Sequence, residues 1–98
     1  MPEYFRDTGF EKTSLVATIT GSATGISAPG SGNSIYILGG NAHAPAVLRE
    51  TNAFGTRILA IASGNCNLPA TVKVTENTAV YATVADHLSI FYYIDKSS

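Results

Sequence analysis

Apolar and polar residues alternate through the last third of the chain. The alternation covers residues 71–75 and 80–84, and residues 88–94 are apolar on both faces of a strand. A period of two residues is typical of β-strands that bury one face, while a strand that is apolar on both sides needs cover on both. We therefore predict three short strands here, separated by turns at residues 76–77 and 85–87.

The preceding chain shows short β-branched or aliphatic runs separated by clusters of Gly, Pro, Asn and Ser. We expect Gly39-Gly-Asn41 to form a turn or a bulge and residues 63–69 to form a turn. Strands and turns that recur about every ten residues indicate an all-β fold, a small antiparallel β-sandwich or barrel of about seven to eight short strands. The further runs that predict strands are residues 14–20, 34–38, 44–50 and 57–62.

The 98 residues suffice for one domain. We assign residues 13–98 to a single β domain and residues 1–12 to an N-terminal arm. Tyr4, Phe5 and Phe10 stand among the charges of the arm. The arm is either a frayed terminus or a segment that docks through these aromatic rings on the body or on a neighbouring subunit.

Charge is scarce in this chain. Charged residues make up 13% of it, about half of the usual share, while 45% are hydrophobic, and the net charge is −1. This balance gives no electrostatic reason to bind nucleic acid or an anionic membrane. A small and apolar chain gains from a partner, so we expect a homo-oligomer, with a trimer among the candidates. The start lacks the pattern of a signal peptide, so we do not expect secretion by that route.

Residues that could carry chemistry are few. His43, His87 and Cys66 are not spaced as metal ligands, so we expect no metal and no cofactor. Asp86 and His87 are adjacent, and adjacent side chains of a regular strand point to opposite sides, which disfavours a catalytic dyad. We therefore expect no catalytic residues and no enzymatic activity.

The aromatic residues of the last strands form the best candidate for a binding site. In strands that we predict to be neighbours, the alternation places Tyr81, Phe91 and Tyr93 on the face that carries the polar residues. Aromatic side chains on that face can pair across the strands. A loop or the N-terminal arm could cover this face. Another subunit or a ligand could equally bury it.

Four segments together resemble a known class of proteins. They are Ser34-Ile-Tyr-Ile-Leu-Gly-Gly-Asn-Ala42, Ala46-Val-Leu-Arg-Glu50, Gly55-Thr-Arg-Ile-Leu-Ala-Ile-Ala62 and Leu88-Ser-Ile-Phe-Tyr-Tyr93. In this order they are similar to small β-sandwich virion proteins of tailed bacteriophages, marine phages among them. The resemblance covers about Thr20 to Ile94 and concerns the pattern, without a diagnostic motif.

This resemblance implies a structural role on a virion, as a head decoration, neck or tail accessory protein. It implies self-association and contact with other virion proteins, and a location in the virion or, before assembly, in the host cytoplasm. It transfers no catalytic residues. Our main expectation is a non-enzymatic assembly subunit. The alternative is a small module that binds carbohydrate or peptide through an exposed aromatic face.

Overall fold

The computed structural model describes residues 15–97, which fold into antiparallel β-strands. The predicted all-β fold is confirmed, although its strands are fewer and longer than expected. Within these residues no helix is long and apolar enough to cross a membrane. The predicted arm and its boundary with the domain lie outside the described residues. The strands are β1 (Leu15–Ile26), β2 (Asn33–Ala42), β3 (Ala46–Glu50), β4 (Arg57–Ile61), β5 (Gly64–Lys73) and β6 (Val80–Lys96).

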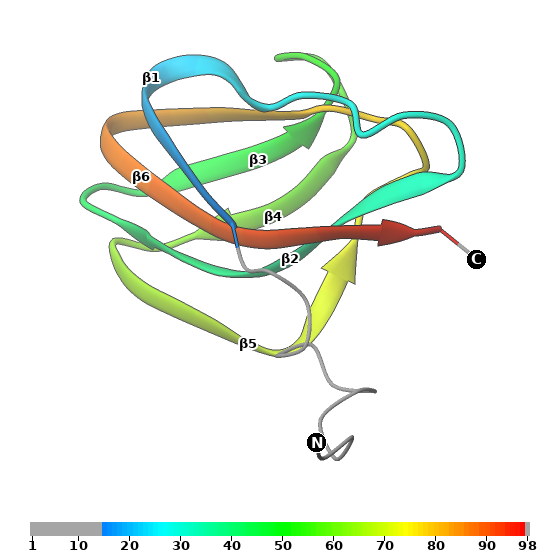
Figure 1. Ribbon diagram of the computed structural model, residues 1–98. Helices are drawn as coiled ribbons and strands as arrows, with labels where there is room; N and C mark the ends of the chain where they lie inside the picture. The colour runs from blue at the N-terminus through cyan, green and yellow to red at the C-terminus, as the bar shows by residue number, and fades with distance from the viewer. Residues whose placement is uncertain (1–14, 98) are drawn as a thin grey trace.

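Strand β6 lies in the middle of the sheet and organises it (Figure 1). Along one side it pairs with β1 over almost its whole length. On the other side, its first part pairs with β3 and its last part with β2. The sheet continues from β3 to β4 and from β2 to β5. Strands β2 and β3 therefore run end to end beside β6, and β4 and β5 run end to end beside them.

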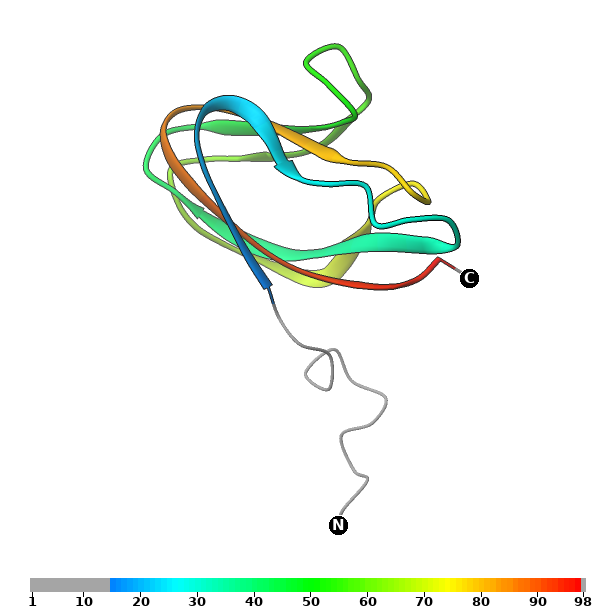
Figure 2. The same ribbon diagram turned by 45° about the horizontal axis from the view of Figure 1, so that its top comes forward.

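The sheet bends at one common level and folds over into two layers, as Figure 2 shows. On β1 and β6 the bend lies where the pairing jumps from Thr20–His87 to Gly21–Val84. Gly21 has a φ of 82°, a conformation that costs glycine little. The other strands bend in the short connections from β2 to β3 and from β4 to β5. We call the two halves the β2–β5 layer and the β3–β4 layer.

The core lies between the two layers. On β6, Val80 and Ala82 point into it from one layer and Leu88 and Ile90 from the other, and each of these is fully buried. The alternation in residues 80–84 is the one that the sequence predicts. The other fully buried large aliphatic side chains are Ile35, Ile37, Leu48 and Val74.

Two predicted turns are wrong. Residues 85–87 belong to the continuous strand β6, because its pairing with the neighbouring strands continues on both sides of the bend, up to Val84 and again from His87 or Leu88. Residues 64–69, expected in a turn, form more than half of β5. Among the described strands β5 has a neighbour on one side only, so its glycine and proline are tolerated. Around Gly39 the pairing of β2 shifts, so the bulge is the correct alternative there.

The loop between β5 and β6 contains the predicted turn at residues 76–77, which is confirmed. Glu76 accepts a hydrogen bond from the backbone N–H of Gly32 at 2.6 Å, and Asn77 accepts one from Gly30 at 2.9 Å. Glu50 accepts two further bonds, from the backbone N–H and the hydroxyl of Thr75. These carboxylate and amide oxygens fasten the loops at the end of the sandwich away from the bend.

Candidate functional site

The outer surface of the β2–β5 layer carries a row of apolar and aromatic side chains. Phe91 and Tyr93 lie two residues apart on β6 and therefore share a face. Phe91 is paired with Val16 of β1, and Tyr93 with Tyr36 of β2. Residues directly opposite on paired strands lie on the same face. We call Val16, Phe91, Tyr93 and Tyr36 the aromatic strip; it crosses the layer from the β1 edge inwards.

The two tyrosines of the aromatic strip hold each other in place. Their rings stack with centroids 5.1 Å apart and planes at 10°. The hydroxyl of Tyr36 donates a hydrogen bond of 2.6 Å to the backbone oxygen of Lys96. Such a pair adds about 0.5 to 1.5 kcal/mol beyond the area that it buries. This end of the strip is therefore pre-organised before any partner binds.

Exposure along the strip rises towards β1. Tyr36, Tyr93 and Phe91 are half-buried, whereas Val16 is 58% exposed. Val16 thus presents an uncovered apolar side chain next to the ring of the residue opposite it. Burial of this end of the strip would remove apolar surface from water, and that is the main favourable term of most protein association.

Tyr81 does not belong to this surface. It lies on β6, as Phe91 and Tyr93 do, so the three residues cannot pair across neighbouring strands as the sequence suggested. The bend of β6 near residue 87 carries Tyr81 into the β3–β4 layer, where it is paired with Arg49 and Thr24. The aromatic partner of Tyr93 is instead Tyr36. Tyr36 lies between the buried residues Ile35 and Ile37, so the alternation places its side chain on the outer face of β2. Tyr36 and Tyr93 are far apart in the sequence, however, and the sequence alone did not reveal that they pair.

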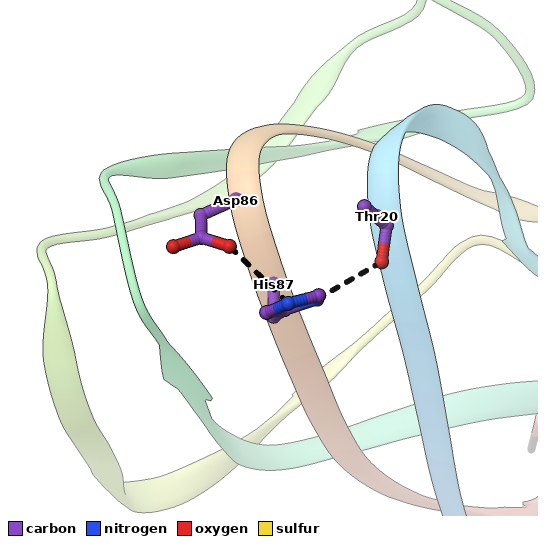
Figure 3. A network of polar contacts seen from close by, with 3 residues as sticks. All are labelled: Thr20, Asp86 and His87. Atoms are coloured by element: carbon purple, nitrogen blue, oxygen red, sulfur yellow. Dashed lines mark hydrogen bonds and ion pairs between the residues drawn. The ribbon is translucent and has the colours of Figure 1, made fainter.

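A second candidate lies at the bend, where Asp86, His87 and Thr20 form the network in Figure 3. His87 Nε2 lies 3.3 Å from Asp86 Oδ1, and His87 Nδ1 lies 3.1 Å from Thr20 Oγ1. The ring of His43 meets that of His87 edge to face, with centroids 5.5 Å apart. The expectation that Asp86 and His87 point apart is wrong, because the register shift interrupts the regular alternation of β6 at this point.

The order carboxylate, imidazole, hydroxyl is the one that activates a nucleophile in hydrolases. Here, however, the side chains of His87 and Asp86 are 58% and 52% exposed, so water competes for each contact. Cys66 lies apart from the histidines, on β5 against the core. Within residues 15–97 no three His, Cys, Asp and Glu side chains are grouped so that they could hold a metal ion. We interpret the network as a set of structural contacts that connect β1 and β6 at the bend.

Comparison with known protein families, curated proteins and solved structures finds no match to this chain. The choice between the network at the bend and the aromatic strip therefore rests on the geometry of each. The network at the bend consists of water-exposed polar groups, whereas the aromatic strip combines a fixed ring pair with an uncovered apolar end. The strip is the stronger candidate.

Proposed function

We propose that this protein is a non-enzymatic assembly subunit that associates with itself through the aromatic strip. The observation that carries the proposal is Val16, which stays 58% exposed at the end of a row of aromatic rings and beside the edge of the sheet. A fully buried valine contributes roughly 1.5 to 3 kcal/mol. A chain with 13% charged residues also has little charge with which to repel a second copy of itself.

The virion is the setting that we propose for this assembly. The support is the resemblance of Thr20–Ile94 to small β-sandwich virion proteins of tailed phages. In such a setting the subunit would decorate a head or form part of a neck or tail, and other virion proteins would be further partners. A scarcity of charge suits permanent interfaces, whose buried centre is depleted in charged residues.

The geometry of the strip favours a protein interface over a platform for carbohydrate. A sugar-binding platform offers the open face of an aromatic ring, whereas Tyr36 and Tyr93 each turn one ring face to the other. The row also ends in an aliphatic side chain at an edge strand, which suits a broad apolar contact. These features support self-association as the leading function.

Light scattering coupled to gel filtration tests this function on the full chain. Mass should be measured over a dilution series that spans micromolar concentrations. We expect a multiple of the chain mass of 10.2 kDa, falling towards that mass on dilution. A single-chain mass throughout the series would overturn the proposed function.

A further inference from the structure

The two edges of the sheet differ in how well they are protected. Among the described strands β1 has one neighbour, β6, so its other side is an edge. Residues 15–20 of this edge, Leu-Val-Ala-Thr-Ile-Thr, contain no charge, no proline and no glycine, and four of the six are β-branched. Natural proteins normally blunt an edge strand with a lysine, a proline or a bulge, because its free N–H and C=O groups can pair with another chain.

The opposite edge of the sheet, formed by β4 and β5, has features that disfavour pairing with another chain. Strand β5 contains Pro69 in the middle and Lys73 at its end. Its pairing with β2 jumps from Val72 to Asn67, which interrupts the ladder. Strand β4 begins with Arg57 and is only 5 residues long. Strand addition is therefore disfavoured along β4 and β5, and the first half of β1 is the better edge for it.

We propose that residues 15–20 of β1 pair antiparallel with the same residues of a second copy, so that the two β2–β5 layers become one continuous sheet. This inference rests on the proposed self-association and names its contact. A second copy is the occupant that the molecule favours, for two reasons. The edge bears no charge that would repel itself. The edge also meets the aromatic strip at Val16, so the contact would place a side chain of the second copy beside the exposed end of the strip.

The faces of the strand limit the register. Val16, Thr18 and Thr20 point to the outer surface, whereas Ala17 and Ile19 are buried at 8% and 4% exposure. In a sheet that continues from one copy to the other, outer residues must stand opposite outer residues. The two-fold axis then passes through Ala17 or through Thr18, as the symmetry of an isologous dimer requires. In both registers Thr18 lies opposite or diagonal to Thr18 of the second copy, and Val16 lies opposite a threonine.

Cross-linking at a single cysteine tests the edge. Thr18→Cys is introduced into the full chain together with Cys66→Ser, which removes the native thiol. The matched control is Thr71→Cys in the same background, since Thr71 is an exposed threonine on the edge strand β5. Each variant is treated with a short bis-maleimide, and the dimer band is measured on a denaturing gel. Circular dichroism and mass must first match those of the parent.

We expect a strong dimer band from Thr18→Cys and a faint one from Thr71→Cys. An oligomer by mass in which Thr18→Cys links no better than Thr71→Cys would overturn the edge contact and leave self-association standing. Preferential linking at Thr71 would move the contact to the opposite edge and also overturn the inference. A single-chain mass for the parent would reject the proposed function and the edge together.

Discussion

Val16→Asp is the sharpest single test of the aromatic strip. The side chain of Val16 is 58% exposed in the folded chain, so an aspartate at this position stays largely in water while the chain is alone. The cost to folding is then mainly the lower strand propensity of aspartate, within about 1 kcal/mol. In a dimer that buries the strip, the same carboxylate must lose water.

The structure sets the size of the effect. Complete burial of a valine side chain is worth roughly 1.5 to 3 kcal/mol, and the exposed part of Val16 accounts for about half of this, roughly 1 to 2 kcal/mol. A symmetric contact contains two copies of Val16, so the lost area alone weakens association by roughly 2 to 4 kcal/mol, or about 30- to 700-fold. The desolvated carboxylate adds several kcal/mol for each copy. We therefore expect Val16→Asp to be a single chain at micromolar concentration.

The measurement is mass by light scattering over a dilution series, with thermal unfolding recorded beside it. Phe54→Asp is the matched control, because Phe54 is 95% exposed on the loop between β3 and β4 and the substitution changes the net charge by the same amount. This control should keep the mass of the parent. If Val16→Asp also keeps the mass of the parent, the strip is not the interface. If both variants dissociate, net charge rather than the strip controls association.

Three further predictions follow from single positions. Tyr93→Ser should weaken association by roughly 1 to 3 kcal/mol, whereas Tyr81→Ser, on the other layer, should leave the dilution series unchanged; equal effects would count against the strip. Gly55→Ala should lower the free energy of unfolding in urea by roughly 1 to 3 kcal/mol, because a Cβ there would overlap the backbone oxygen of Glu50, and an unchanged midpoint would contradict this packing. Ser34→Ala should raise the free energy of unfolding by about 1 kcal/mol, because the buried Ser34 hydroxyl has no hydrogen-bond partner, and a clear loss of stability would show that it has one.

The period of two residues along 80–84 predicted which side chains of the first part of β6 enter the core, whereas 88–94 was predicted as a strand apolar on both faces. Val80 and Ala82 are buried as the alternation requires, and in the later part the structure buries the face of Leu88 and Ile90. Alternation is a local property of extended backbone, so it survives whatever the neighbouring strands are. The all-β class could also be predicted from local features, because Gly, Pro and Asn separate the short apolar runs.

The candidate surface depended on information that is not local. Tyr36 faces Tyr93 only because β2 and β6 pair in one particular register, across 57 positions of sequence. Likewise, Asp86 and His87 have the polarity of a turn, yet they lie inside β6, whose pairing with β1 continues before and after the bend. The same bend places Tyr81 away from Phe91 and Tyr93, although an uninterrupted two-residue alternation along β6 would put all three on one face.

The sequence by itself thus determined the strand-forming pattern, most of the buried residues and the shortage of charge, because each depends on residue type and on spacing along a few positions. Only the tertiary structure decided the bend of the sheet, the pairing of Tyr36 with Tyr93 and the position of residues 15–20 at an edge of the described strands. These features depend on the register in which strands far apart in the sequence are hydrogen-bonded. The position of each strand is set by the distant segments against which it buries one face. A single sequence does not reveal those partners, since many registers satisfy the same alternation.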